Sequence, residues 1–576
     1  MIRIKDHKTG YIFDPWDYLG PKRRKLMEES WAGLFRQEIL DELPVNEIAS
    51  AFSDIYGRPT KELSMALGVL VLQQMQDLTD EETSQQVAFN LQWHYALDIT
   101  EESDEAKYLC PRTLWHLRQL VTEKELDTVL FQTITDKLAR VFKVDASQQR
   151  LDSVHIQSNM RHLGRIGIVV QTIHKFLVNL KRQHSDLFGT LPSELVDRYL
   201  PEKALGCFSM VKPSESERTL KQICQDLFEL VQQMSGCSEV ASMSSFQLLQ
   251  RVLKEQCHIQ EAEGQPATVT VKAAKEVSSD SLQNPSDPDA GYDAHKGKGY
   301  QAQLLETYSE TKEQLSLITA VQVESATAHD VHALIPAIES AAARGLKPTQ
   351  VLADTAYGSE DNLERAQELG VEVIAPAMGA YRSDRLPLSQ FAFSDSGEVV
   401  RCPRGQEPER VRRKQDHYRI AFPLTPCAGC PVQDQCPTKP GKKYRYLRYD
   451  HKVFRLAQRR QVEQTEAFKQ RYRFRAGVEG AFSAWDRRTG VKHLRVRGGK
   501  AVRFAVTVKA AAMNILRAKA FKTRETQEGG TPPDVTSLVY RPFSIFKELI
   551  GKIFKLPDKL FAIRENDFHF HVKCAA

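Results

Sequence analysis

Apolar residues recur every three or four positions through most of the first 145 residues, a spacing typical of helices that bury one face. The clearest stretches are KELSMALGVLVLQQMQDLTDEETSQQVAFN (61–90) and RTLWHLRQLVTEKELDTVLFQTITDKLARVF (112–142). Helices are predicted to start at TDEE (79–82) and SDEA (103–106), where a capping residue precedes acids. We therefore expect a helical N-terminal domain over 1–145.

The pattern changes at QQRLDSVHIQSNM (148–160), which reads as a short strand containing Asp152. Helical spacing returns from 163 to 258, so 163–284 is predicted to be a helical insertion that ends in a loop rich in Ser, Pro, Gly and Asp. A hairpin, a helix, a strand, a helix and a final strand follow: 299–309 with 315–325, 330–345, 350–358, 359–370 and 371–377. Asp330 and Ser359 are the expected caps of the two helices. This order predicts an α/β layer with a mixed sheet.

The last third of the chain is expected to be less regular. Residues 380–460 look rich in loops and contain four of the ten cysteines. One strong helix is predicted over 462–488, ending at Thr489-Gly490, and another over 502–518. The expected parts of the chain are an N-terminal helical domain (1–145), a catalytic core (146–162 and 285–380 with 460–520), a helical insertion (163–284), a cysteine-rich insertion (381–459) and a C-terminal tail (521–576).

Composition agrees with a folded chain of several domains, because 576 residues exceed one ordinary core and 41% of them are hydrophobic. The formal net charge of +5 says little about partners. The sequence shows no apolar run near the roughly 18 residues of a membrane span and no hydrophobic signal core at its start. A cytoplasmic protein without a membrane partner is expected, with cysteines that are not paired as disulfides.

Three acids are candidates for a shared site: Asp152 within the first strand, Asp354 at the end of VLAD, and Glu479 on the 462–488 helix. Sites in α/β sheets form at the carboxyl ends of strands. Asp354 is the best single candidate, because the next helix already has Ser359 as its cap. Three carboxylates would suit two Mg²⁺ or Mn²⁺ ions and phosphodiester chemistry. The alternative is that each acid is a cap or a solvated strand end.

The helix expected around Glu479 carries further polar residues. Tyr472, Arg475, Glu479 and Asp486 fall at offsets of three, four and seven, which places them on one face, and Val478, Phe482 and Trp485 form an apolar stripe that could dock on the sheet. Arg475 and Tyr472 are predicted to hold a phosphate beside Glu479. The alternative for Arg475 is a plain helix ion pair with Glu479, worth about 0.3–0.5 kcal/mol.

The spacing Tyr472-x2-Arg475-x3-Glu479 resembles the signature of the DDE transposases of bacterial insertion sequences. LDSVHIQSNM, NPSDPDAGYDAHKGKGYQAQLLETYS, VLADTAYGS and GVEGAFS with RTGVKHLRVRGGKAVRFAVTVKAAAMNI are similar to the subgroup named for insertion sequence 1182. The resemblance extends over most of residues 1–520.

The resemblance implies a ribonuclease-H-like catalytic core with Asp152, Asp354 and Glu479 as its acid triad. It also implies an N-terminal region that binds the inverted repeats of the element, and a homodimer on DNA. One position departs from the family pattern. The signature has a lysine seven positions after the glutamate, where this chain has Asp486, followed by Arg487 and Arg488.

Cys402, Cys427, Cys430 and Cys436 have the spacing C-x24-C-x2-C-x5-C, with glycine and prolines nearby. Four thiolates favour a closed, structural Zn²⁺ site, so a small zinc-knuckle insertion is predicted. The alternative is a set of inert buried thiols.

Basic residues gather on both sides of Glu479. Residues 439–475 contain thirteen Lys or Arg against three acids, and 487–500 contain six and none. Such runs are often only solvated faces, but this imbalance is local in a nearly neutral chain and favours contact with DNA phosphates. The predicted DNA contacts are Tyr472, Arg475, Arg487, Arg488 and Lys492.

Together these features predict a transposase that binds double-stranded DNA, both inverted repeats and target, and works on the nucleoid in the cytoplasm. It would cut DNA and transfer strands by in-line phosphoryl transfer. Two alternatives stay open: a related two-metal nuclease that cuts without joining, and an inactive or domesticated DNA-binding protein.

Overall fold

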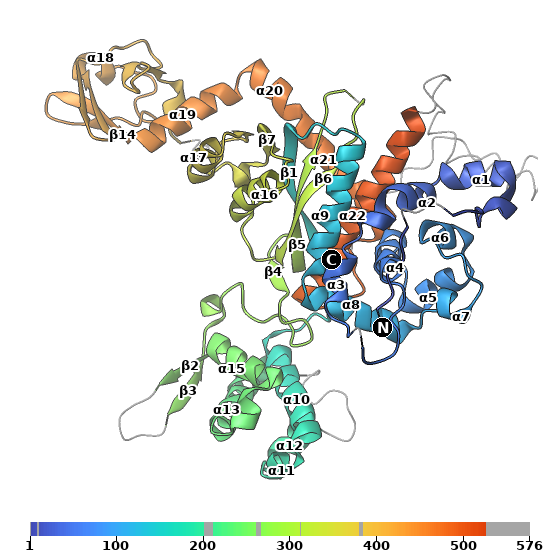
Figure 1. The fold of residues 1–576 in the computed structure, drawn as a ribbon. Coiled ribbons are helices and arrows are strands. Elements are labelled where there is room, and N and C mark those ends of the chain that lie inside the picture. The colour runs from blue at the N-terminus through green and yellow to red at the C-terminus, as the bar shows by residue number, and fades with distance from the viewer. Residues whose placement is uncertain are drawn as a thin grey trace, which may run out of the picture. The chain divides into compact units, whose positions relative to one another are not determined.

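A mixed β-sheet with helices packed around it forms the centre of the computed structural model (Figure 1). The structure describes residues 2–7, 11–53, 55–200, 211–260, 267–311, 313–379 and 384–525. The tail expected over 521–576 therefore lies outside the described residues from 526 onward, as do Cys207 and Cys574.

The central sheet has its strands in the order β6-β5-β1-β7-β8, with β4 on the same edge of β5 as β6. Their bounds are β1 Gln148–Gln157, β4 Gly291–Asp293, β5 Gly297–Thr307, β6 Ile318–Ser325, β7 Gln350–Ala353 and β8 Glu372–Ile374. Strands β1, β7 and β8 are parallel, whereas β5 runs antiparallel to both β1 and β6. The prediction of a mixed α/β sheet is confirmed.

Helices make up the N-terminal region, as its periodicity predicts. The α-helices are α1 Gly20–Glu28, α2 Trp31–Leu34, α3 Val45–Ala49, α4 Leu63–Gln76, α5 Asp80–Phe89, α6 Leu91–Ala96, α7 Asp104–Lys107, α8 Pro111–Glu123 and α9 Leu126–Val141. Thr79 caps α5 in a full capping box with Glu82, and Ser103 caps α7. Helix α4 is buried along almost its whole length, which explains its uninterrupted apolar run.

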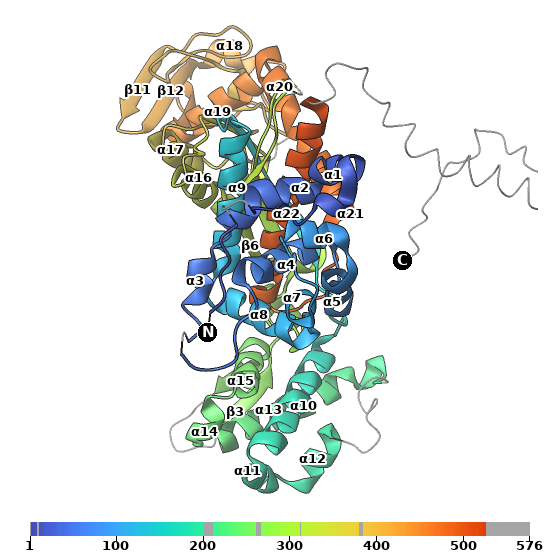
Figure 2. The same ribbon diagram turned by 45° about the vertical axis from the view of Figure 1, so that its right-hand side comes forward.

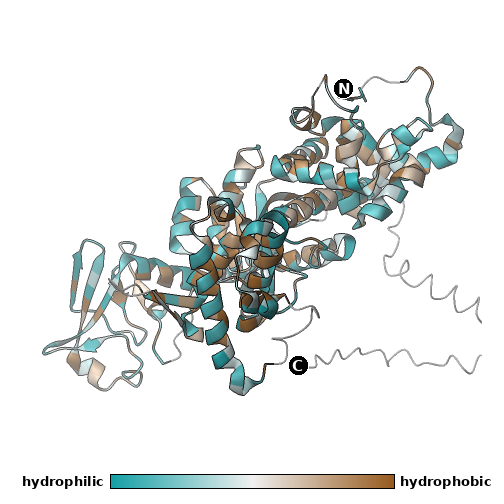
Figure 3. Ribbon diagram, turned by 90° about the horizontal axis from the view of Figure 1, so that it is seen from below, coloured by the Kyte–Doolittle hydropathy of each residue, from teal (hydrophilic) through white to brown (hydrophobic). Residues whose placement is uncertain are grey.

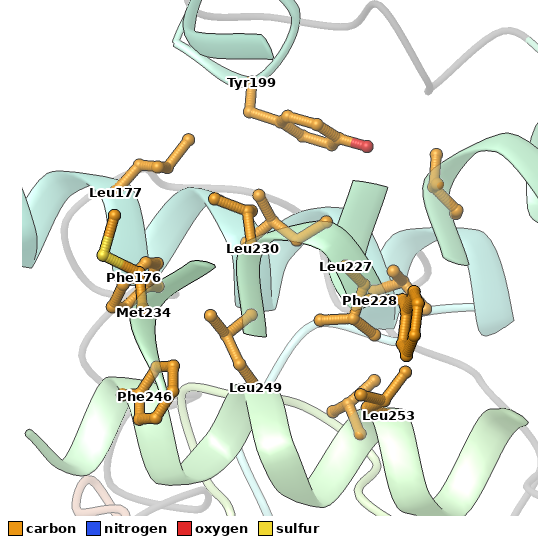
Figure 4. Close-up of a cluster of buried hydrophobic side chains, with 14 of the residues drawn as sticks. Phe176, Leu177, Tyr199, Leu227, Phe228, Leu230, Met234, Phe246, Leu249 and Leu253 are labelled. Carbon is orange, nitrogen blue, oxygen red and sulfur yellow. The ribbon is translucent and has the colours of Figure 1, made fainter. Parts of the chain in front are cut away.

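The segment after β1 is helical and has a hydrophobic core of its own. Its main helices are α10 Arg165–Gln183, α13 Ser216–Met234 and α15 Ser244–Gln256, accompanied by α11 Ser185–Gly189, α12 Ser193–Tyr199 and α14 Ser238–Ala241. Phe176, Leu227 and Leu249, one from each main helix, are buried in the same cluster of hydrophobic side chains (Figure 4). A hairpin not predicted from the sequence, β2 Cys257–Gln260 with β3 Thr268–Val271, follows α15.

Residues 380–460 contain more regular structure than expected. Strands β11 Arg410–Lys414, β12 His417–Pro423, β14 Tyr444–Asp450 and β13 Lys439–Pro440 form a sheet in that order, and β9 Ala392–Phe393 pairs with β10 Val399–Arg401. Helices α18 Leu424–Ala428 and α19 His451–Glu463 complete the segment. Its small core is built around Tyr418, Ile420 and Phe422 of β12. The expectation of mostly loop was wrong here, because short strands between charged residues give a weak sequence signal.

The single helix predicted over 462–488 is interrupted. Helix α19 ends at Glu463, α20 covers Glu466–Tyr472, a 3-10 turn η9 covers Arg473–Ala476, and α21 covers Gly477–Thr489. Thr465 caps α20 through a hydrogen bond from Phe468 N–H, so the polar pair Gln464-Thr465 marks a true helix boundary. The predicted end at Gly490 is confirmed, since that glycine adopts the left-handed conformation with φ of 63°.

Helices cover the central sheet: α16 Leu334–Ala342, α17 Glu360–Glu368, α9 and the long α22 Gly499–Glu525. Figures 1 and 2 both show α9 and α22 side by side. The buried Asn514 links them to β6, since its amide donates to Thr135 and bonds to both backbone groups of Ile318. Figure 3 shows hydrophobic and hydrophilic residues on opposite sides of many helices. Across the described ranges, no helix is both long and apolar enough to cross a membrane.

Lys509 of α22 is 2% exposed and ties the end of α21 to the N-terminal helices. Its ammonium lies 2.8 Å from Asp77, the left-handed residue that ends α4, and it also donates to the carbonyl of Thr489 at the end of α21. Arg495 pairs with Asp77 at 3.1 Å. The backbone carbonyl of Lys509 in turn accepts from the indole of Trp485. One buried cation thus holds α4, α21 and α22 together.

We expect Lys509→Met to lower the free energy of unfolding by about 1–3 kcal/mol, because Asp77 and the Thr489 carbonyl lose their shared donor. Urea unfolding followed by circular dichroism would measure this. Lys500→Met, on the exposed first turn of the same helix, should change stability by less than about 0.5 kcal/mol. Equal losses in the two variants would contradict the role given to Lys509.

Candidate active site

Asp152 and Asp354 lie side by side although 202 residues separate them. Strands β1 and β7 are parallel, and their register pairs Leu151 with Ala353. The residues that follow this pair are Asp152 on β1 and Asp354 directly after β7. Neighbouring strands are about 4.7–4.9 Å apart, so this register alone brings the two acids together at the end of β7.

The guanidinium of Arg475 lies between the two carboxylates. Its Nη2 atom is 2.8 Å from Oδ2 of Asp152 and 3.4 Å from Oδ2 of Asp354. The side chains of Arg475 and Asp152 are 20% and 14% exposed, whereas Asp354 is 46% exposed. The site is therefore buried on the β1 side and open to solvent on the β7 side.

Burial and neighbouring charges shift the pKa values of this cluster. Burial raises the pKa of Asp152, and the charges of Asp354 and Asp330 raise it further against the opposing effect of Arg475. Burial, followed by the charges of both aspartates, also raises the pKa of Tyr472 to about 12, although Arg475 opposes this. Tyr472 therefore keeps its proton at neutral pH and can only donate a hydrogen bond to an anion.

Glu479 lies on the first turn of α21, four residues after Arg475, and its side chain is exposed. Burial lowers the pKa of Arg475, but neighbouring negative charges raise it above its usual value. Asp152 and Asp354 contribute most to this rise, and Glu479 contributes as well. The structure thus places Asp152, Asp354, Tyr472, Arg475 and Glu479 in one electrostatic cluster. The predicted apolar stripe is also confirmed, because Val478, Phe482 and Trp485 are buried.

Arg150 anchors the segment that carries Arg475. It lies two residues before Asp152 on β1, so the two side chains share one face of the strand. Its guanidinium pairs with the buried Glu306 of β5 at 2.7 Å and donates to the carbonyl of Phe474 at 2.9 Å. This contact holds η9 against the sheet directly before Arg475.

Gly477 makes room for that anchor. A Cβ atom at this position would lie 2.2 Å from Nη1 of Arg150, closer than any real contact. Gly480, in the same helix, has open space around it. A residue with a Cβ atom at the start of α21 would have to displace the end of the Arg150 side chain, so packing favours glycine here, which spacing arguments did not identify.

A third carboxylate near the site, Asp330, was assigned by sequence to a helix cap. That assignment is wrong, because α16 begins at Leu334 after Ala333. Asp330 instead accepts hydrogen bonds from Gln303 at 2.6 Å and from the Ser153 hydroxyl at 3.4 Å. Burial and the charges of Asp330, Asp152 and Asp354 raise the pKa of Tyr357, which donates to Gln303. Strands β6 and β1 run in the same direction, so Asp330, which follows β6, lies at the same end of the sheet as Asp152. This relation between the strands is the signal that the sequence reading missed.

Asp354 also differs from expectation in one respect. It caps the short 3-10 helix η7 Thr355–Tyr357, and its Oδ1 accepts from the Thr355 N–H at 2.6 Å. The reasoning that it has nothing to cap was wrong. Its other oxygen is the one that faces Arg475, so one carboxylate performs both roles.

The remaining predicted DNA contacts lie farther from the acids. Arg487 and Arg488 are exposed near the end of α21, about 12 Å beyond Glu479 at 1.5 Å per residue. Lys492 follows that helix, and its carbonyl accepts from Gln157 N–H at the end of β1. Asp486, which replaces the basic residue of the family pattern, accepts from the Lys492 N–H at 3.0 Å and so stabilises this turn.

Cys402, Cys427, Cys430 and Cys436 line one cavity of about 160 Å³, and none of them forms a disulfide. Burial raises the pKa of the Cys427 thiol, and the nearby thiols, Cys436 first, raise it further. In the ranges that the structure covers, however, no three His, Cys, Asp or Glu side chains are close enough to hold a metal ion. Between Asp152 and Asp354, the positive charge is supplied by the guanidinium of Arg475.

Comparison with known families gives two matches. Residues 401–518 match the transposase DDE domain, and residues 26–120 match the transposase domain known as DUF772. Both are transposase domains. The first match contains Tyr472, Arg475 and Glu479 together with the four cysteines, and the second spans the end of α1, all of α2 to α7 and most of α8. No curated protein matches the chain.

The two matches support a DDE transposase and agree with the mixed sheet and many helices of the fold. Asp152 and Asp354 lie outside both matched ranges, so their place in the site depends on the register of β1 and β7. Transposase DDE domains generally use divalent metal ions and have DNA as their partner.

Gly477→Ala should destabilise the fold by about 1–3 kcal/mol, because the methyl group displaces the guanidinium of the half-buried Arg150 from the carbonyl of Phe474. Gly480→Ala is the matched control in the same helix and should stabilise it by roughly 0.5–1 kcal/mol. Thermal unfolding of both variants would test this. A Gly477→Ala protein as stable as the Gly480→Ala protein would rule out the proposed packing role.

Proposed function

We propose that this protein is a DNA transposase that binds terminal inverted repeats, cleaves DNA and transfers the cut strands by in-line phosphoryl transfer. The observation that carries the proposal is the convergence of Asp152 and Asp354 on Arg475, with Glu479 one turn away on α21. Two acids and an arginine from distant parts of the chain form a half-open cluster, and the helix segment that completes it belongs to the transposase DDE match.

The order β6-β5-β1-β7-β8 supports a ribonuclease-H-like core. In such a core, the first three strands form an antiparallel meander and the last two are added parallel to the first. Here β1, β5 and β6 form the meander, interrupted by the helical insertion, and β7 and β8 are the parallel additions. Asp152 then lies on the central strand β1, Asp354 directly follows the adjacent strand β7, and Glu479 lies on helix α21.

The donor set of the site fits hard divalent ions. Asp152, Asp354 and Glu479 offer only carboxylate oxygens, which Mg²⁺ and Mn²⁺ prefer. The ion pairs of Arg475 with both aspartates support a preference for positive charge at this position. Two such ions bound there would lower the pKa of an attacking water and neutralise the departing oxygen.

The residues of the chain then have separate roles. Asp152, Asp354 and Glu479 supply the ligands, while Arg475 and the protonated Tyr472 hold the phosphate that is attacked. Water first attacks the phosphorus and releases a 3′-hydroxyl; that hydroxyl next attacks a target phosphodiester and releases a target 3′ oxygen. Arg487, Arg488 and Lys492 are proposed to contact DNA along the path leading from α21.

We further propose that the N-terminal helices recognise the inverted repeats, since they contain the second transposase match. Two DNA ends must be held together for strand transfer, so a homodimer on DNA in the cytoplasm is proposed. Membership of the insertion sequence 1182 subgroup is supported by the cysteine cluster located between Asp354 and Glu479.

A structural Zn²⁺ is proposed for Cys402, Cys427, Cys430 and Cys436. The support is that four thiols line the same small cavity, and that three of them, Cys402, Cys430 and Cys436, act electrostatically on Cys427. Four cysteine ligands form a closed site, which would stabilise the segment 384–459 and leave no open position for catalysis.

Asp354→Asn should keep DNA affinity and lower cleavage by more than about 100-fold, because a ligand carboxylate is lost while the shape and the η7 cap are kept. The substrate is a duplex carrying the inverted repeats that flank the gene, incubated with Mg²⁺. Asp361→Asn, an exposed acid on α17, is the control and should cleave normally. Cleavage by Asp354→Asn at the normal rate would refute the site; cleavage without joining of pre-cut ends would indicate a nuclease.

Freshly purified protein should contain about one Zn²⁺ per chain by elemental analysis, and Cys430→Ser should lose most of it. Cys237→Ser, a half-buried cysteine in the helical insertion, should retain the metal. A chain that contains no zinc, or a Cys430→Ser protein that retains it, would favour inert thiols.

A further inference from the structure

The small sheet of residues 410–450 has two different faces. Tyr418, Ile420 and Phe422 of β12 point into its core. Side chains alternate along a strand, so His417, Arg419 and Ala421 belong to the opposite face. On this outer face the register pairs Arg412 of β11 with Arg419, and Arg419 with Arg448 of β14.

Three arginines therefore stand in one row across three neighbouring strands. All three are exposed, and no carboxylate of the described residues lies within 4 Å of any of them. Like charges directly opposite one another on adjacent strands destabilise a sheet. Arg410 and Lys414 extend the positive charge along β11, at about 6.6–6.8 Å per two residues.

Protection of a sheet edge does not explain this arrangement. Strand β11 is at the edge of the sheet, where positive charges commonly prevent pairing with another chain. Arg419, however, belongs to β12, which is paired on both sides at this position, so its charge cannot protect an edge. The side of β14 away from β12 is paired with β13 only at Arg445 and Tyr446, so Arg448 lies at an unpaired stretch. Edge protection therefore leaves the middle arginine of the row unexplained.

Two acids beside this face have other hydrogen-bond partners. Asp450, opposite His417, caps α19 by accepting from Val453 N–H at 2.8 Å. Glu409 accepts from the Tyr444 hydroxyl at 2.9 Å. The five basic residues Arg410, Arg412, Lys414, Arg419 and Arg448 outnumber these two carboxylates, so the outer face has a net positive charge.

Aromatic rings on this face are already covered. The guanidinium of Arg419 lies 4.2 Å from the ring centre of Tyr446, and that of Arg410 lies 5.3 Å from the ring centre of Tyr444. Both distances are within the range of cation–π contacts. Covered rings cannot stack on unpaired bases, so the face suits the phosphates of a duplex better than a single strand.

We propose that this outer face, formed by Arg410, Arg412, Lys414, Arg419 and Arg448 and called here the arginine face, binds the phosphate backbone of double-stranded DNA without regard to sequence. The choice of DNA as the polyanion rests on the proposed function. The face is separate from the acid cluster and from the predicted contacts after Glu479, so it adds a second docking surface to the chain.

The test compares two double variants of the full chain, each of which removes two positive charges from this segment. Arg412→Gln with Arg448→Gln removes the two ends of the arginine row. Arg401→Gln with Arg413→Gln is the control, because Arg401 pairs with Glu407 and Arg413 belongs to the opposite face of β11. The probe is a fluorescent 30-base-pair duplex of random sequence, titrated between 50 and 300 mM salt without divalent ions.

The plot of log K against log salt has a negative slope, and loss of two phosphate contacts should make it shallower by about 1.8. Binding at 0.1 M salt should weaken roughly tenfold or more. The control should keep the slope of the unaltered chain. Arg412→Lys with Arg448→Lys should restore most of the affinity, because lysine also binds phosphate as a point charge. Thermal unfolding should confirm that all variants fold.

Equal losses in both double variants, or unchanged binding in Arg412→Gln with Arg448→Gln, would overturn the inference. So would a loss confined to binding of anionic phosphatidylserine vesicles or of double-stranded RNA. Failure of the proposed function gives a different result. If Asp354→Asn cleaves DNA normally while Arg412→Gln with Arg448→Gln binds the duplex weakly, the arginine face is supported and the proposed active site is refuted. The reverse pattern would refute the face and leave the site intact.

Discussion

Repulsion between two neighbouring carboxylates is the constraint on which the rest of the structure depends. The parallel register of β1 and β7 places Asp152 and Asp354 next to each other, and burial of Asp152 makes its charge costly. A positive charge between them offsets this repulsion when both are ionised. Arg475 supplies that charge here, and Asp354 lies on the more exposed side of the site.

The elements around the cluster can be understood as supports for that arginine. Arg150 on β1 holds the carbonyl of Phe474, Gly477 leaves space for Arg150, and α21 then continues with its apolar stripe buried. At the far end of α21, Lys509 binds both Thr489 and Asp77. The helix that carries Glu479 is thereby connected at one end to the sheet and at the other to the N-terminal transposase match.

The cysteine-rich segment combines two kinds of chemistry on one small scaffold. Its strands bury Tyr418, Ile420 and Phe422 on one face and display a row of arginines on the other. Such a small core leaves little stability to offset the repulsion in that row. The four cysteines line one cavity in the same segment.

Sequence alone determined the local features of this protein. Apolar spacing located the N-terminal helices, β1, the β5–β6 hairpin and α22, and cap residues such as Thr79 and Ser359 marked helix starts, because these features depend on nearby residues. The interruption at η9, the sheet between 410 and 450, the role of Asp330 and the need for glycine at 477 were decided only by tertiary structure. Each depends on contacts between residues far apart in the chain, such as Arg150 with Phe474, and local periodicity carries no information about such contacts.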